Sequence, residues 1–156
     1  MFQRLINKFC WGLVRWFPNR YRIIHTDGKK YLLRFYIKRN GILPGCYLHH
    51  FFRGDMDRDL HNHPWNLSGS FILTGGYLEE RLDPETKEVY KRQIKPGRLN
   101  VIRANDFHRV DLLTGRAWTL FMSGKKVKDW GFYIRDTGEY IPHKQYVNSK
   151  ERVSND

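Results

Sequence analysis

The segment GDMDRDLHNHPWNLSGSFILTG, residues 54–75, carries the strongest pattern in this chain of 156 residues. Within it, His61 and His63 flank a single residue. Side chains two residues apart on a β-strand point to the same face, about 6.6 Å apart along the chain, close enough to share one metal ion. A third histidine, His108, lies on another candidate strand far along the chain. A pair from one segment and a single residue from a distant strand predict an open metal site.

The sequence around this segment alternates apolar and polar residues with a period of two, which is typical of half-buried β-strands. We predict strands at residues 30–38, 46–53, 65–73, 77–82, 88–94, 100–102, 107–112, 118–123 and 130–134. Turn signals such as Gly75-Gly76 and Pro96-Gly97 separate them. Short strands that recur about every ten residues favour a sandwich or barrel over βαβ units. The 40% of hydrophobic residues can form the core of one domain, and no apolar run is long enough for a conventional transmembrane helix.

The first motif resembles that of the cupin superfamily. In cupins a glycine precedes a His-x-His pair, and a glutamate and a second glycine follow it. Here Gly54, His61 and His63 match in register, Ser68 stands where the glutamate is usual, and Gly75 closes the motif. A serine is a poor ligand for a divalent ion, so the expected ligands are histidines alone.

The second cupin motif is matched in part. Gly97 and His108 agree with its glycine and histidine, whereas Arg103 and Asn105 replace its proline and second glycine. Asparagine tolerates a left-handed turn, so Asn105 is an acceptable substitute. Leu112 replaces the final asparagine of the motif.

The resemblance covers roughly residues 46–123 and implies an all-β fold, the cupin double-stranded β-helix or jelly-roll barrel. Residues 47–65 also look like a set of uncharacterised bacterial and phage cupin proteins. The resemblance implies a divalent metal ion on His61, His63 and His108. Fe(II) is favoured, and Zn, Mn or Ni would also accept three imidazoles.

The expected function is a metal-dependent cupin enzyme that acts on a small, anionic molecule, in first place an Fe(II) dioxygenase or oxygenase. Three neutral ligands leave the charge of the ion uncompensated, which favours an anionic ligand. The alternative is a non-catalytic barrel that binds a ligand or serves as an accessory protein. The resemblance also carries the expectation of a homodimer.

Two further residues are candidates for the catalytic site. His49 and His50 point to opposite faces of their strand, so at most one faces the interior, and we favour His49 over the nearly equivalent His50. Arg53 has the same parity as His49, and an inward arginine would bind a carboxylate or phosphate. Asp59, just before the histidine pair, is a candidate for orienting a histidine, although such aspartates more commonly belong to a solvated loop.

The positive charge is concentrated at the start of the chain. The net charge is +12, and residues 1–39 hold ten basic residues and one acidic residue, Asp27. Residues 2–17 read as an amphipathic helix with an apolar side formed by Phe2, Leu5, Phe9, Leu13 and Trp16. We expect this side to pack on the domain. Contact of residues 2–22 with a membrane surface or nucleic acid is the alternative.

The predicted organisation has three parts: residues 1–25 form the basic helix and a linker, residues 26–136 the barrel, and residues 137–156 a tail. Two cysteines, Cys10 and Cys46, do not make a disulfide framework. No convincing secretory signal is present, so we expect a reducing, cytoplasmic setting. Cellular and viral origins are equally compatible with the sequence.

Overall fold

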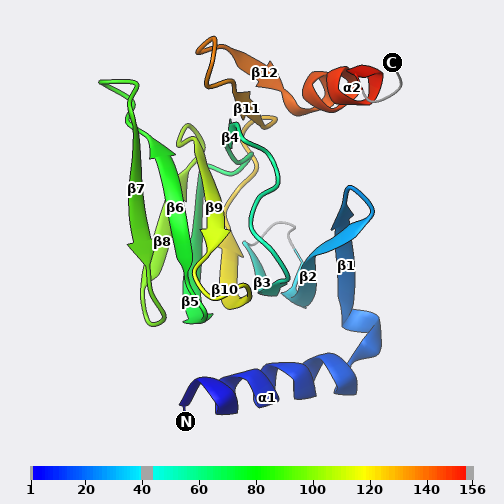
Figure 1. Cartoon of the computed structure of the whole chain (residues 1–156). Helices are drawn as coiled ribbons and strands as arrows, with labels where there is room; N and C mark the ends of the chain where they lie inside the picture. Colours follow the sequence, from blue (N-terminus) through cyan, green and yellow to red (C-terminus); the bar gives the residue numbers. More distant parts are fainter. Residues whose placement is uncertain (1, 40–43, 154–156) are drawn as a thin grey trace.

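The computed structural model describes residues 2–39 and 44–153, which form two antiparallel β-sheets packed face to face with a helix towards each chain end (Figure 1). The elements in chain order are α1 (Phe2–Trp16), the 3₁₀ turn η1 (Pro18–Arg20), β1 (Tyr21–Thr26), β2 (Lys29–Lys38), β3 (Gly45–Phe51), β4 (Leu60–His61), β5 (Leu67–Thr74), β6 (Tyr77–Leu82), β7 (Val89–Ile94), β8 (Leu99–Arg103), β9 (His108–Leu112), β10 (Ala117–Ser123), β11 (Gly131–Tyr133), β12 (Tyr140–Pro142) and α2 (His143–Val153).

Each sheet has six strands drawn from both halves of the chain. One sheet runs β1-β2-β3-β10-β5-β8 and the other β12-β11-β4-β9-β6-β7. The predicted all-β barrel architecture is confirmed, and so is the N-terminal helix. The expectations at residue 1 and at residues 154–156 lie outside the described residues.

The structure also contains elements that the sequence pattern did not predict: β1, β4, β12 and α2. The boundary expected after residue 25 falls inside β1, which pairs along its length with β2. The segment expected as a tail from residue 137 continues the second sheet, because β12 pairs with β11 and leads directly into α2. The first and last strands, β1 and β12, are therefore part of the two sheets.

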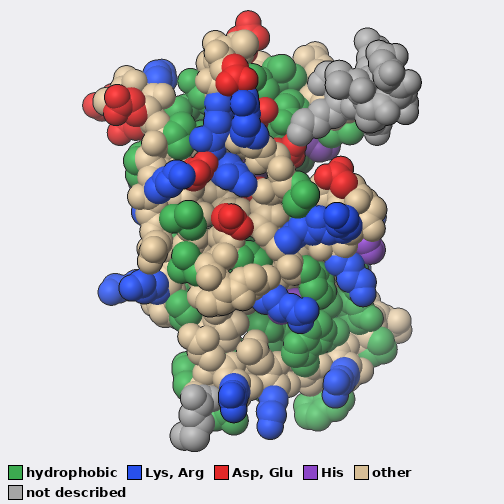
Figure 2. Space-filling view, viewed as in Figure 1, with side chains coloured by type: hydrophobic (Ala, Val, Ile, Leu, Met, Phe, Trp, Pro, Cys, Tyr) green, Lys and Arg blue, Asp and Glu red, His purple; other side chains and the backbone are tan. Residues whose placement is uncertain are grey.

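Helix α1 packs on the barrel with a different side from the one predicted. Its buried residues are Cys10 and Val14, which join a core cluster with Trp118 of β10. Apart from the half-buried Leu13, the predicted apolar side is exposed, so the predicted packing face is wrong. The short Cys10 and Val14 side chains allow close approach to the sheet, whereas bulkier ones would hold the helix away. Lys and Arg side chains gather beside hydrophobic ones along the lower edge of the molecule, where α1 lies (Figure 2).

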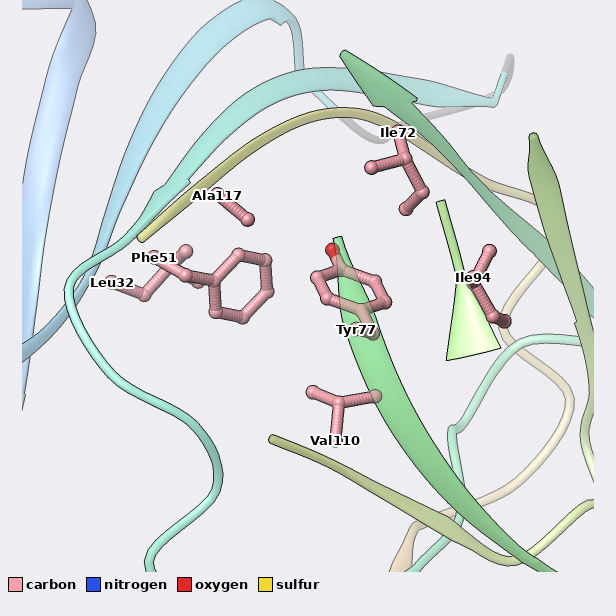
Figure 3. Close-up of a cluster of buried hydrophobic side chains, with 7 residues drawn as sticks. All are labelled: Leu32, Phe51, Ile72, Tyr77, Ile94, Val110 and Ala117. Atoms are coloured by element: carbon pink, nitrogen blue, oxygen red, sulfur yellow. The ribbon is translucent and has the colours of Figure 1, made fainter. Parts of the chain in front are cut away.

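A second core cluster lies between the two sheets, with its side chains directed towards one another (Figure 3). Both sheets contribute to it, and its buried members are Leu32, Phe51, Ile72, Tyr77, Ile94, Val110 and Ala117. Four of these residues, Leu32, Phe51, Tyr77 and Val110, also line the cavity described below. The core thus forms one wall of the cavity.

The turn between β5 and β6 explains one glycine of the first motif. Gly75 has φ +81°, a left-handed conformation that L side chains rarely adopt. A Cβ atom added there would also overlap the carbonyl oxygen of Arg116. Only glycine meets both demands, so this position fixes the close packing of the β5–β6 turn against the start of β10.

Candidate metal centre

The structure brings the three predicted histidines together from separate segments. His61 ends β4, His63 follows two residues later, and His108 begins β9. His61 and His108 are directly paired across β4 and β9. Potential ligand atoms of the three imidazoles lie within 4.8 Å of one another, and the Nε2 atoms of His63 and His108 are 2.9 Å apart.

The residue between the paired histidines holds their segment in place. Asn62 is buried, and its backbone N–H donates to the carbonyl of Gly131 in β11. The side-chain oxygen of Asn62 accepts the N–H of the same glycine at 2.9 Å. This two-point attachment fixes the backbone between His61 and His63, so both imidazoles reach the site although β4 is only two residues long.

The distances and protonation states fit a divalent metal ion. Two nitrogens that are each about 2.1 Å from one ion, at a right angle to each other, lie about 3.0 Å apart, close to the observed Nε2–Nε2 separation. Burial lowers the pKa of His61 to about 4, with His108 adding to the effect. Burial and the neighbouring imidazoles hold the pKa of His63 well below its usual range. These two imidazoles are therefore neutral near pH 7, as metal coordination requires.

A carboxylate orients His108 from behind. His108 Nδ1 lies 2.8 Å from Oε1 of Glu79, a fully buried residue of β6. Burial alone would raise the pKa of Glu79, but the hydrogen bond with His108 and the charge of Arg81 lower it to about 2. An ionised carboxylate only accepts, so Nδ1 of His108 donates and its Nε2 is left to face the other histidines.

The sequence raised two questions about carboxylates: what Ser68 does at the usual glutamate position, and whether Asp59 orients a histidine. Ser68, at the usual glutamate position, is buried and its hydroxyl donates to the carbonyl of Ile102. Asp59 accepts hydrogen bonds from Tyr146 and Arg135 and contacts no histidine, so the suggestion that it orients one is wrong. Within the part of the chain that the structure describes, no carboxylate belongs to the three-histidine group.

A second carboxylate supports the site from the loop after β3. Asp55 Oδ2 lies 3.9 Å from Nδ1 of His61 and accepts the backbone N–H of Val110 at 2.7 Å. Its other oxygen accepts the hydroxyl of Tyr31. The preceding Gly54 lies against the backbone of β9, where a Cβ would collide with Val110 and Asp111. This close approach explains the first glycine of the motif.

The three histidines line a cavity of about 800 Å³ between the sheets. His49 also lines it, as favoured from the sequence, whereas His50 lies on the other side of its strand against Trp11 and Trp118. The Nε of Arg34 donates to Nε2 of His49 at 3.0 Å, and Arg34 is itself part of the cavity wall.

Arg53 does not line the cavity. Its Nε donates to the carbonyl of Lys30, and its Nη1 contacts the sulfur of Met56. The strand that carries His49 ends at Phe51, so its alternation does not extend to residue 53. The structure therefore brings Arg34 to the cavity in place of Arg53, and a catalytic role for Arg53 stays a prediction.

Aromatic side chains form much of the remaining wall. Trp65 stacks on His63 with ring centroids 5.8 Å apart, and Trp130 lies edge-on to His61 at 6.2 Å. Helix α2 supplies His143 and Tyr146; His143 stacks on Trp130 at 4.0 Å. The sequence analysis predicted a tail for residues 137–156, so a wall built by the C-terminal helix is a feature that the sequence pattern missed.

Several solved structures have the same architecture. Fe(II)-HppE with the alternative substrate (S)-1-HPP superposes with a TM-score of 0.53 at 14% identity, over 68% of this chain and 57% of that one. Hydroxypropylphosphonic acid epoxidase from S. wedmorenis gives 0.51 at 14% identity, over 68% and 56%. An uncharacterised conserved protein with a double-stranded β-helix domain from Klebsiella pneumoniae gives 0.51 at 10% identity, over 70% and 89%.

No protein-family model matches the chain, and no curated protein matches it. The chain spans little more than half the length of the two iron-enzyme and epoxidase structures. The structural similarity shows the fold: the protein is a double-stranded β-helix. Its three-histidine group fits a divalent metal ion.

Proposed function

We propose that the protein is a metal-dependent cupin enzyme that acts on a small anionic molecule, with Fe(II) bound by His61, His63 and His108. The convergence of three imidazoles in a cavity, with no carboxylate in the group, carries this proposal. An ion held by three neutral ligands keeps its full positive charge and attracts an anionic group. Fe(II) there would supply the redox chemistry for a reaction of the substrate with O₂.

Iron is favoured over Zn, Mn or Ni by similarity, because the solved structures with this fold include a protein named as Fe(II)-HppE. Three imidazoles by themselves also suit the other ions. The second candidate, a non-catalytic ligand-binding barrel, is favoured by one observation. The usual carboxylate position holds the buried Ser68, whose hydroxyl is directed to a backbone carbonyl.

Arg34 supports an anionic substrate. Its guanidinium lines the cavity, and no carboxylate of the described residues lies within ion-pair distance of it. Burial lowers its pKa, because the positive charge loses solvating water there. The charge of Arg34 also helps to lower the pKa of His63, so the two groups share one electrostatic environment. A carboxylate or phosphonate in the cavity would gain a charge-assisted hydrogen bond to Arg34.

His49 positions Arg34 in this scheme. The burial of His49 and the nearby guanidinium hold the pKa of His49 well below its usual range, so the ring is neutral and its Nε2 accepts from Arg34. His49 stacks on Phe121, whose ring lies 6.3 Å from that of His63. Arg34 and the three histidines line the same cavity, so a bound molecule would extend from the guanidinium to the metal position.

Metal analysis of protein purified without a histidine tag tests the proposal. We expect near-stoichiometric metal in the wild type and its loss in a His61→Ala/His108→Ala variant. His25→Ala is the matched control, because His25 is an exposed histidine outside the cavity. Wild-type protein that binds no metal, even after reconstitution with Fe(II) and Zn(II), would contradict the proposal.

A spectroscopic measurement separates the enzyme from the non-catalytic barrel. Nitric oxide is an analogue of O₂ that binds Fe(II) only where a coordination position is open. We expect a strong half-integer-spin EPR signal from the Fe(II)-loaded protein with nitric oxide, and no such signal from the His61→Ala/His108→Ala variant. A fully loaded wild type without this signal would favour the binding barrel.

A further inference from the structure

Helix α1 has a second apolar side that no part of the described structure covers. Cys10 and Val14 are 2% and 6% exposed against the barrel, whereas Phe2, Phe9 and Trp16 are 74%, 65% and 78% exposed. At 3.6 residues per turn, these three residues and the exposed Leu5 fall within an arc of about 60°. We call these four residues the apolar stripe.

A basic stripe runs beside the apolar stripe. Arg4, Lys8 and Arg15 are all exposed and fall within an arc of about 40° on the solvent side of the helix. The first acidic residue of the chain is Asp27, so no carboxylate within residues 1–26 neutralises these charges. In Figure 2 the corresponding edge of the molecule shows Lys and Arg side chains next to hydrophobic ones.

We propose that α1 docks the protein on an anionic phospholipid bilayer, with the apolar stripe inserted at the headgroup boundary and the basic stripe on the lipid headgroups. Separate apolar and basic sides, with Trp and Phe on the apolar side, are the features by which helices lie in a membrane interface. No helix among the described residues is long and apolar enough to cross a membrane. The helix therefore lies on the surface.

Two other occupants fit the stripes less well. A second copy of the chain would bring two basic stripes together, which like-charge repulsion opposes. Nucleic acid would use the basic side chains but would leave most of the apolar stripe in water, because phosphate contacts supply most of such binding. Of these three occupants, only an anionic lipid surface would contact the apolar stripe and the basic stripe favourably at once.

Co-sedimentation of the full chain with vesicles tests the proposal. We expect binding to vesicles of phosphatidylcholine with phosphatidylserine, weaker binding at high salt, and little binding to phosphatidylcholine alone. The variant Arg4→Glu/Lys8→Glu should lower the affinity at least about 25-fold, since each basic side chain near an anionic surface contributes about fivefold. The variant Phe9→Ser/Trp16→Ser should lower it more than tenfold.

The matched control is Lys125→Glu/Lys144→Glu, which makes the same change in net charge at two exposed lysines outside α1. This control should bind vesicles within about twofold of the wild type. Wild type that does not bind the anionic vesicles at low salt overturns the proposal. So does a control that loses as much affinity as the α1 variants.

A second measurement covers the case in which a double variant is unstable. Lipids brominated on their acyl chains quench tryptophans that enter the bilayer, and the single variant Trp16→Phe should lose most of the quenching seen in the wild type. Unchanged quenching refutes insertion of α1. Concentration-dependent dimerisation that Phe9→Ser/Trp16→Ser abolishes in the absence of vesicles points instead to a second copy. Tighter binding to a DNA duplex, sensitive only to Arg4→Glu/Lys8→Glu, points to nucleic acid.

Discussion

Replacement of Glu79 by glutamine should weaken metal binding although Glu79 is not in the three-histidine group. Its Oε1 lies 2.8 Å from Nδ1 of His108 and 2.7 Å from Nδ2 of Asn100, and Arg92 Nε donates to its Oε2 at 2.6 Å. Glu79→Gln keeps the size of the side chain but removes its charge and one acceptor. Loss of such a partner typically lowers metal affinity 10–100-fold, or about 1.4–2.7 kcal/mol.

The assay compares the melting temperature of each protein with and without saturating metal. Since a change of 1 kcal/mol shifts Tm by roughly 2–4 °C in a domain of this size, the metal-induced rise in Tm should be about 3–10 °C smaller in Glu79→Gln than in the wild type. The comparison within each protein cancels the stability lost when a buried charge next to Arg81 and Arg92 is neutralised.

Glu80→Gln is the matched control, because Glu80 is the neighbouring glutamate and its carboxylate contacts Arg135 and Lys91 instead of a histidine. It should keep the metal affinity of the wild type. A folded Glu79→Gln protein that binds metal within about threefold of the wild type would refute the role of Glu79 in orienting His108. An equal loss in Glu80→Gln would also refute it.

Three further predictions follow from the same structure. Arg34→Met should weaken the binding of methylphosphonate to the metal-loaded protein at least tenfold, measured by calorimetry, because a charge-assisted hydrogen bond contributes about 1.5–3 kcal/mol. An equal loss of affinity in Arg53→Met would assign that role to Arg53 instead. Gly75→Ala should lower the free energy of unfolding in urea by at least about 2 kcal/mol, because of backbone strain at a positive φ and overlap of the new Cβ with Arg116. The loss should exceed that of Gly115→Ala, because Gly115 has a similar φ but open space around it. Burial and Arg116 lower the pKa of His50 to about 4, below the 6.5 of an unfolded chain, so the unfolded state takes up the proton first. The contribution of His50 to the free energy of unfolding is therefore flat above pH 6.5 and falls by about 2 kcal/mol by pH 5. Urea unfolding at a series of pH values should show this fall in the wild type and not in His50→Leu. Identical pH profiles of the two proteins would contradict the prediction.

The metal centre could be predicted because its signal is local in the sequence. The cupin pattern lies in the spacing of His61 and His63 and in the glycine before His108. These features can be recognised without knowing which strands pair with one another. Glu79 carries no such signal, since the Glu79-Glu80 pair reads as an ordinary polar stretch of a strand. Its role depends on the pairing of β6 with β9, which sets Arg81 opposite His108 and turns Glu79 to the same interior face. Strand register decides this, and one strand alone does not reveal it.

Arg34 was missed for a related reason. Arginine is mostly a surface residue, so an inward arginine was predicted only at Arg53, in the segment that leads to the histidine pair. Yet Arg34 shares its strand face with Leu32, which belongs to the core between the sheets. The alternation within residues 30–38 places Leu32 and Arg34 on the same face of the strand. Which of the two faces is interior depends on the position of β2 between β1 and β3, which the sequence does not give.

The packing side of α1 shows where periodicity misleads. The helix has large apolar residues over more than half of its circumference. The periodicity therefore predicted that the side with the largest of them packs on the domain. Packing instead selected Cys10 and Val14, which fit closely against the sheet. The C-terminal helix was missed because its apolar periodicity is weak and Tyr146 is its only buried residue among those whose side chains are described.

The positions of α1 and α2 at opposite ends of the barrel affect how substrate reaches the cavity (Figure 1). Residues of α2 line the cavity, so this part of the cavity wall would lie away from a bilayer holding α1. Strand β2 has ten residues, which corresponds to about 30 Å of extended chain. The Debye length at physiological ionic strength is about 8 Å, so a negative lipid surface would be screened well before that height. An anionic metabolite that enters the cavity beside α2 would therefore meet no repulsion from a bilayer bound through α1.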